Sequence, residues 1–146
     1  MAKDYNPEMH TAEHILNAVM TGRKGVRSFS NHIEKKKSKC DFRLESPLTE
    51  EEIILIEKNV NDVINSKLPV TAFEISVDEA EKKFNLERLP EGSGEMIRIV
   101  KIGEFDEYPC IGEHVENTGS IGRFRIVSSD CNNGIMRIRF RLDSPE

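Results

Sequence analysis

The chain lacks the features of a membrane protein or of a secreted, disulfide-rich protein. Three of its 146 residues are cysteines, and none is tryptophan. An odd number of cysteines without a disulfide-framework spacing is typical of a reducing compartment, so we expect a cytoplasmic protein. No apolar run approaches the ~20 residues that a membrane-spanning helix needs, and no signal-peptide pattern is present, so we expect no membrane partner.

The chain also lacks an overall positive charge. Its net charge of -5 argues against a protein that coats nucleic acid non-specifically. Cations are nevertheless concentrated locally, in a cluster at Arg23, Lys24, Arg27, Lys35, Lys36, Lys37 and Lys39 and in a stripe at Arg123, Arg125, Arg137, Arg139 and Arg141. Each group either lies on the solvent-exposed face of a sheet or binds phosphates. The length suits one domain, residues 1–146, and no obligate protein partner is evident.

Histidine is scarce as well, and its placement is informative. The chain has four His and three Cys, and four of these seven form two pairs with the same spacing, His10 with His14 and Cys110 with His114. On a helix, positions i and i+4 share one face, so two imidazoles there can reach one ion. Because His nitrogen and Cys thiolate both suit zinc, we expect these four residues to hold one Zn²⁺ tetrahedrally.

Three helices are indicated by their start and stop signals. Asn6-Pro7-Glu8 has the N-cap, the first-turn proline and the acid of a helix start, and Gly22 can end that helix. Thr49 to Glu52 is a capping box that opens a second helix, which ends near Lys67. A second possible capping box, at Ser76 and Glu79, predicts a short helix through Phe84.

Strands are predicted over residues 28–33, 39–44, 70–76, 96–102 and 123–127, and Asn132-Asn133-Gly134 predicts the turn of a closing hairpin. Residues 90–94 read as a surface loop. Hairpins beside helices favour an α+β fold, a two-layer antiparallel sheet with helices packed on it. The alternatives are a doubly wound parallel sheet and a small barrel.

A carboxylate lies within the first histidine pair. Glu13 turns it into His-x-x-Glu-His, in which the acid can accept a proton from metal-bound water or from substrate. The same spacing occurs in inverted zinc proteases, but a Cys-x3-His pair is not their second motif. The alternative is a solvated charge on the helix surface.

Two motifs together resemble a known family. The stretch from His10 to Leu16, His-Thr-Ala-Glu-His-Ile-Leu, is similar to the His-Thr-Ala-x-His-Leu-Leu motif of the alanyl-tRNA synthetase editing domain. The stretch from Cys110 to Phe124 resembles that family's Cys-x-Gly-x-His-Val and Thr-Gly-x-Ile-Gly-x-Phe pattern. In size the chain resembles the short free-standing alanyl-tRNA editing proteins, and threonyl-tRNA synthetases carry a related domain.

The resemblance implies an enzyme that hydrolyses mischarged tRNA in trans, chiefly Ser-tRNA(Ala), with the tRNA acceptor end as its partner. It implies zinc ligands at His10, His14, Cys110 and His114. Catalytic roles fall to Glu13 and Thr11, and substrate contacts to Thr11, Ser30, Asn31, Gly112 and Thr118. Two stretches depart from the family pattern, because Ile111 replaces a glycine and Ser28 to His32 lacks the usual Gln...Gly-Ser.

Three other functions stay open on the sequence. The same domain edits Ser-tRNA(Thr) in threonine systems. His-Thr-Ala-Glu-His also resembles the zinc motif of S-ribosylhomocysteinases, a lyase family whose pattern does not call for His114. The last alternative is a zinc-stabilised module that binds tRNA without catalysis.

Overall fold

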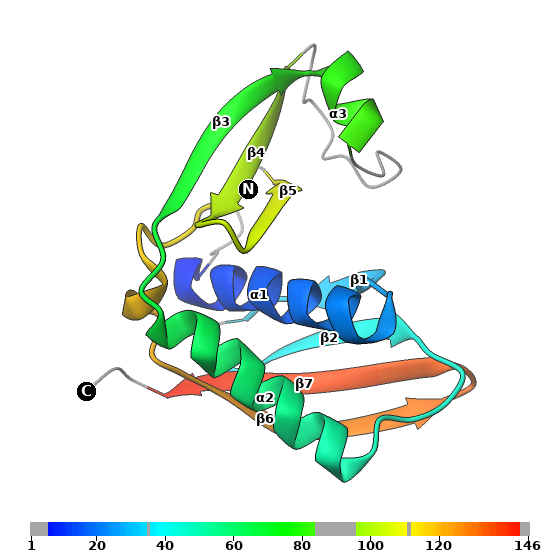
Figure 1. Ribbon diagram of the computed structural model, residues 1–146. Coiled ribbons are helices and arrows are strands. Elements are labelled where there is room, and N and C mark those ends of the chain that lie inside the picture. The colour runs from blue at the N-terminus through cyan, green and yellow to red at the C-terminus, as the bar shows by residue number, and fades with distance from the viewer. Residues whose placement is uncertain (1–5, 35, 84–95, 111, 144–146) are drawn as a thin grey trace.

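The computed structural model describes residues 6–34, 36–83, 96–110 and 112–143. The predicted loop at 90–94 lies outside these residues. The described chain contains two antiparallel sheets, and its α-helices are α1, α2 and α3 (Figure 1). This arrangement confirms the α+β prediction.

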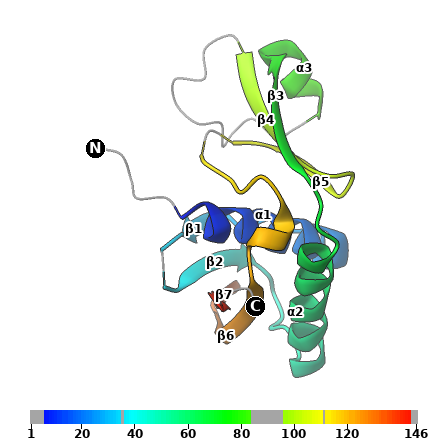
Figure 2. The same cartoon turned by 90° about the vertical axis from the view of Figure 1, so that its left-hand side faces the viewer.

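The larger sheet has the order β1-β2-β7-β6, with every neighbouring pair antiparallel. Its strands are β1 (Ser30–His32), β2 (Ser38–Arg43), β6 (Arg123–Asn132) and β7 (Ile135–Asp143). The helices α1 and α2 lie on one side of this sheet, and no described helix or strand covers its other face, called here the uncovered face (Figures 1 and 2). Inward-facing side chains of the strands and helices form the main core, including Leu16, Phe42, Ile56, Phe124 and Phe140.

The helix α1 (Pro7–Lys24) begins as its start signal predicts. The side chain of Asn6 accepts a hydrogen bond from Met9 N, and Pro7 occupies the first turn. The helix does not end at Gly22; it continues to Gly25, which adopts the left-handed conformation with φ of 69° and donates to Thr21 O. Helix interiors tolerate glycine at a modest cost, whereas a left-handed cap selects it.

The helix α2 (Glu50–Asn65) has the predicted capping box between Thr49 and Glu52. It also protects the edge strand β6. Asn61 accepts from Phe124 N and donates to Phe124 O, so its amide pairs with the strand as a neighbouring backbone would. Glu57 accepts from Ile126 N beside the irregularity in β6. Such side-chain pairing leaves less of the edge open to other chains.

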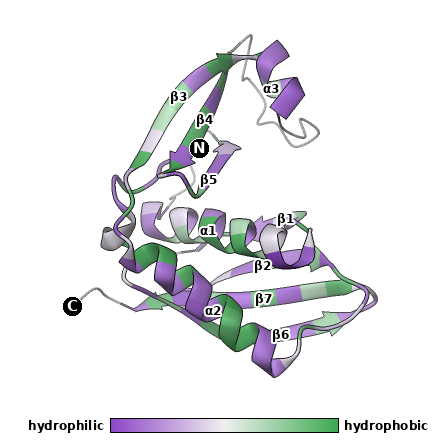
Figure 3. Ribbon diagram, in the orientation of Figure 1, coloured by the Kyte–Doolittle hydropathy of each residue, from purple (hydrophilic) through white to green (hydrophobic). Residues whose placement is uncertain are grey.

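The smaller sheet has the order β3-β4-β5 and stands above α1 in Figure 1. It consists of β3 (Val70–Ser76), β4 (Met96–Ile102) and β5 (Asp106–Pro109), with α3 (Val77–Lys83) following β3. Ala80, Ile97 and Ile99 form its own small core, and most of the α3 ribbon has the hydrophilic colour (Figure 3). The strand β5, which periodicity did not predict, carries the chain directly to Cys110.

The two sheets meet through the segment around the short 3-10 turn η2 (Thr118–Ser120). The Thr118 hydroxyl accepts from Leu68 N, and Val70 N donates to Glu116 O. No helix in the described ranges has the length and apolar character needed to cross a membrane.

Candidate metal centre

Both early histidines lie on one face of α1. His10 and His14 are one turn apart, their ring centroids lie 5.1 Å apart, and both are buried. Because α1 begins at Pro7, both histidines lie in its first turns. The predicted pairing of two imidazoles on one helix face is therefore present.

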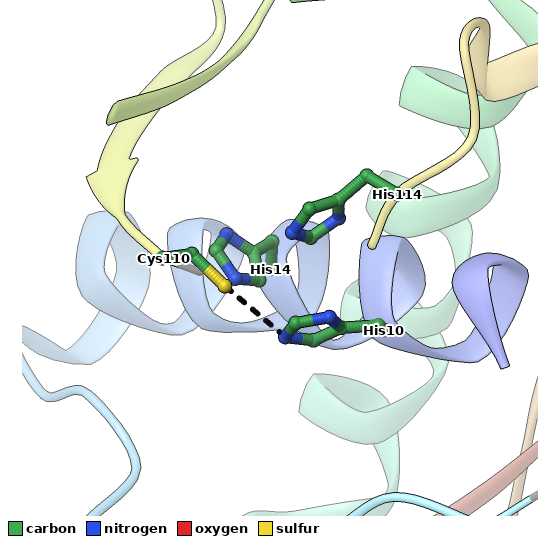
Figure 4. Close-up of side chains that lie close together, drawn as sticks. All are labelled: His10, His14, Cys110 and His114. Atoms are coloured by element: carbon green, nitrogen blue, oxygen red, sulfur yellow. Dashed lines mark hydrogen bonds between the residues drawn. The ribbon is translucent and has the colours of Figure 1, made fainter. Parts of the chain in front are cut away.

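The second pair reaches this face from the other sheet. Cys110 follows the last residue of β5, and His114 lies four residues further along. The His114 ring stacks on His10 at 4.3 Å between centroids and meets His14 edge-on at 4.6 Å. Cys110 Sγ lies 3.4 Å from His10 Nε2 (Figure 4). One ligating atom from each of the four residues lies within 4.8 Å of the others.

Two buried ring nitrogens at the centre are suited to bind a metal ion. Thr11 Oγ1 donates to Pro7 O, so its hydroxyl can only accept from His114 Nδ1, which leaves the His114 Nε2 lone pair unused. His114 Nε2 and His14 Nδ1 are both buried and have no hydrogen-bond partner among the described residues. Buried polar atoms are rarely left unpaired, and a metal ion would satisfy them. The donor set of three imidazoles and one thiol suits zinc.

Burial also prepares the histidines to bind metal. It is the main cause that lowers the pKa of His10 and His14, and it lowers the pKa of His114 to about 3. All three rings are therefore neutral near pH 7, the form that ligates. Burial raises the pKa of the Cys110 thiol to about 11, so metal binding must displace its proton.

Two contacts hold the second pair in place. Arg98 on β4 donates from Nη1 to the carbonyl oxygens of Cys110 and Gly112, both at 2.9 Å. Gly112 packs directly on the His10 ring: a Cβ at this position would lie 2.2 Å from His10 Cε1. His10 Nδ1 in turn bonds to Glu113 O. The geometry thus gives Gly112 a close packing role, and its predicted contact with substrate stays a prediction.

Thr11 and Glu13 both lie beside the centre. The Thr11 hydroxyl bonds Pro7 O and His114 Nδ1 and accepts from Val115 N at 3.2 Å. Glu13 is buried, and its Oε2 accepts from Asn17 Nδ2 at 2.7 Å. Its charge adds to the effect of burial in raising the pKa of the Cys110 thiol. The alternative of a solvated Glu13 does not hold, and the catalytic roles of both residues stay predictions.

The remaining predicted substrate residues occupy different places. Asn31 pairs with the buried Cys40 and bonds Ser28, on the side of β1 that faces α1. Ser30 pairs with Asp41, whose carboxylate meets Arg137 on the uncovered face, and side chains alternate along a strand. Thr118 is fully buried, and its hydroxyl bonds backbone groups of Val63, Ile64 and Leu68. Their predicted contacts with substrate stay untested.

Sequence reasoning missed a polar cluster beside His14. The Arg27 guanidinium lies 3.5 Å over the Tyr108 ring, which meets His14 edge-on at 6.2 Å. Arg27 also lies 3.9 Å from Asp106, and burial raises the pKa of that carboxyl. Tyr108 and Asp106 belong to β5, so predicting that strand would have pointed to both. Arg98, in contrast, is one cation in an ordinary strand and carries no sequence signal.

Comparisons with known proteins relate this chain to tRNA synthetases. Residues 97–139 match the family model described as the threonyl and alanyl tRNA synthetase second additional domain. The alanine--tRNA ligase of Fervidobacterium nodosum is 40% identical over 132 residues, and that of Caldicellulosiruptor saccharolyticus is 38% identical over 133. Each alignment covers 88% of this chain but 15% of the ligase.

A third relative shows the same disproportion in length. The alanine--tRNA ligase of Treponema denticola is 34% identical over 137 residues, which are 92% of this chain and 23% of that protein. The chain thus spans a small part of the curated relatives that it matches. Both motifs and the antiparallel α+β fold agree with these matches, and the chain therefore belongs with the second additional domain of threonyl and alanyl tRNA synthetases.

Proposed function

We propose that the chain is a zinc-dependent deacylase that hydrolyses the ester of a mischarged tRNA, with Ser-tRNA(Ala) as its substrate. The observation that carries this proposal is the convergence of His10, His14, Cys110 and His114 in a relative of synthetase domains. Those relatives are named alanine--tRNA ligases, which favours tRNA(Ala) over tRNA(Thr).

The four residues would hold Zn²⁺, which supplies a fixed positive charge for polar groups of the substrate. With all four ligands bound the site is closed, so the chain itself must position the attacking water. Glu13 is suited to accept the proton of that water, because its carboxylate is buried beside the centre and one oxygen is held by Asn17.

Selection of serine follows from hydrogen bonding. A synthetase pocket cannot strongly reject an added hydroxyl, so hydrolysis after charging raises accuracy. A pocket that bonds the serine hydroxyl rejects alanine, because the pocket's polar groups would otherwise be left unpaired. Asn31, held by Ser28 Oγ at 2.6 Å on the α1 side of β1, is the group we assign to this contact.

The first experiment supplies purified protein with Ser-, Gly- and Ala-charged tRNA(Ala) and with Ser-charged tRNA(Thr). We expect release of serine from tRNA(Ala) to be fastest and alanine to be retained. Faster release from tRNA(Thr) would assign the chain to threonine editing. Tight tRNA binding without any release would favour the non-catalytic module.

The second experiment ties the activity to the metal. The substitutions His10→Ala and Cys110→Ala should abolish both bound zinc and deacylation. Matched controls are His32→Ala, at an exposed position of β1, and Cys131→Ala, in β6, whose thiol lies 4.0 Å from Leu44 O and is not part of the cluster. Stoichiometric zinc retained in both centre variants would refute the site.

A further inference from the structure

A basic hollow lies at one end of the uncovered sheet face. It has a volume of about 360 Å³ and is lined by Lys36, Lys37 and Lys39, by Arg139, and by Ser38 and Glu34. Four cations and one acid therefore line a concave surface in a chain whose net charge is -5. The charge of the hollow is therefore opposite in sign to the net charge of the protein.

The loop that presents two of these lysines is held by its own hydrogen bonds. Ser38 is buried, and its hydroxyl accepts from Glu34 N at 3.0 Å and donates to Glu34 O at 3.1 Å. Lys36 and Lys37, between these two anchors, are exposed. The loop ends are thus fixed while the ammonium groups stay available to a ligand.

The strands below the loop place like charges opposite each other. Lys39 on β2 is directly across from Arg139 on β7, and Arg125 is directly across from Arg141 on the same face. Directly opposed like charges destabilise a sheet. Asp143 offsets the second pair, with 3.1 Å contacts to both arginines.

The Lys39–Arg139 pair is only partly neutralised. Asp130 contacts Arg139 at 2.8 Å, but Lys36, Lys37 and Lys39 form no ion pair within the described part of the chain. A hollow lined by more cations than acids is suited to an anionic ligand.

The chain path places this hollow below the start of α1. After the cap at Gly25 the chain reverses, and Ser28 N donates to Asn17 Oδ1, so β1 runs back toward the end of α1 that carries His10. The strand β2 returns from the loop, and its buried Cys40 belongs to the same core cluster as Met9 and Ala12 of α1. Figure 2, which looks from the end where α1 begins, shows the connection between β1 and β2 at this end.

We propose that the basic hollow formed by Lys36, Lys37, Lys39 and Arg139 binds backbone phosphates of the tRNA acceptor stem while the charged 3' end occupies the metal centre. This inference rests on the proposed function. Cations that contact phosphates supply affinity without reading sequence, and each contact makes binding more sensitive to salt. The β1–β2 connection that carries Lys36 and Lys37 lies at the end of the molecule where α1 begins (Figure 2), so the stem would run along that end, from the sheet face away from α1 to the centre.

The test reverses the two exposed charges with the double variant Lys36→Glu/Lys37→Glu. Its matched control is Lys82→Glu/Lys83→Glu on α3, which changes the same charge at two exposed, adjacent lysines. Deacylation of Ser-tRNA(Ala) is measured against tRNA concentration at several salt concentrations. A second substrate, serine esterified to adenosine alone, has no stem to bind.

We expect the hollow variant to raise KM for Ser-tRNA(Ala) about 10-fold, and to lower the slope of log(kcat/KM) against log[salt] by about 1 to 2. Hydrolysis of seryl-adenosine should not change. The α3 control should keep the wild-type KM and slope. An unchanged KM in the hollow variant, or an equal rise in both double variants, would overturn the proposal.

A failure of the proposed function gives a different result, because the wild-type protein then hydrolyses neither substrate. Binding of an acceptor-stem RNA hairpin, followed by fluorescence anisotropy, still tests the hollow. Weaker binding by the Lys36→Glu/Lys37→Glu variant alone supports a phosphate surface. Equal binding by all three proteins rejects it.

Discussion

Thr11 Oγ1 lies 2.9 Å from His114 Nδ1 and joins α1 to the loop that carries the second half of the candidate metal centre. Because Thr11 already donates to Pro7 O, it accepts from His114 and leaves the other ring nitrogen with its lone pair. Thr11, the residue after His10, thus fixes the orientation of the His114 ring. Hydrogen bonds of this kind fix the ring and the tautomer of a ligating histidine.

The orienting role of Thr11 predicts a change in metal affinity. Thr11→Val removes the hydroxyl with little change of volume, and zinc affinity should fall by about 10- to 100-fold. Thr11→Ser keeps the hydroxyl and should keep the affinity. Competition with a chelator of known affinity measures both. If the Thr11→Val variant binds zinc as tightly as the wild type, the contact of Thr11 with His114 does not orient that ring for zinc.

Gly112 should not accept a side chain. In Gly112→Ala the new Cβ would meet the His10 ring at 2.2 Å, so the ring must move and zinc affinity should fall about 10-fold or more. Gly22→Ala is the control, because nothing lies within 4 Å of a Cβ there, and it should stabilise α1 by about 0.5 to 1 kcal/mol. Zinc content and thermal unfolding of both variants give the comparison. Full zinc affinity in Gly112→Ala would show that the loop adapts at no cost.

Arg98 should act on the centre without touching metal. Arg98→Met loses both bonds to the carbonyls of Cys110 and Gly112, and we expect zinc affinity to fall about 10-fold. Lys101→Met on the same strand removes a cation whose partner is the exposed Glu104 and should have no effect. Zinc affinity is measured by chelator competition. Equal zinc affinity in the two variants would show that Arg98 does not support the centre.

The pair of Asp41 and Arg137 should make stability depend on pH. Two hydrogen bonds from Arg137 are the main cause that lowers the pKa of Asp41 in the folded protein. The stabilisation is therefore present above the ordinary Asp pKa of about 4 and is lost as the pH falls through the lower folded value.

Urea unfolding measures this effect. Asp41→Asn should unfold at lower urea than the wild type at pH 7, and the difference should shrink as the pH falls below the ordinary Asp pKa of about 4 and Asp41 becomes protonated. Asp130→Asn, which breaks a more exposed pair with Arg139, should change the midpoint little. A difference that stays constant with pH would show that the charge of Asp41 is not its cause.

Local signals predicted much of the fold. The cap at Asn6, the capping box at Thr49 and the turn at Asn133-Gly134 each depend on neighbouring residues, and each is present. The predicted end of α1, at Gly22, was three residues too early. Both Gly22 and Gly25 could have ended the helix, and the C-cap is Gly25. The short strand β5 was missed because its four residues do not show a clear alternation.

The sequence by itself determined the donors of the candidate centre, since the i, i+4 spacing of His10 and His14 places both on one helix face wherever that helix packs. It also determined the family, through motifs near both ends of the chain. Only the tertiary structure decided that Cys110 and His114 reach those histidines, because pairing of β4 with β5 and the bonds of Arg98 act across distances that no local pattern encodes. Strand pairing also decides which residues share a face of the sheet. It places Ser30 and Asn31 on opposite faces, and it places Arg139 beside Lys39 in the basic hollow.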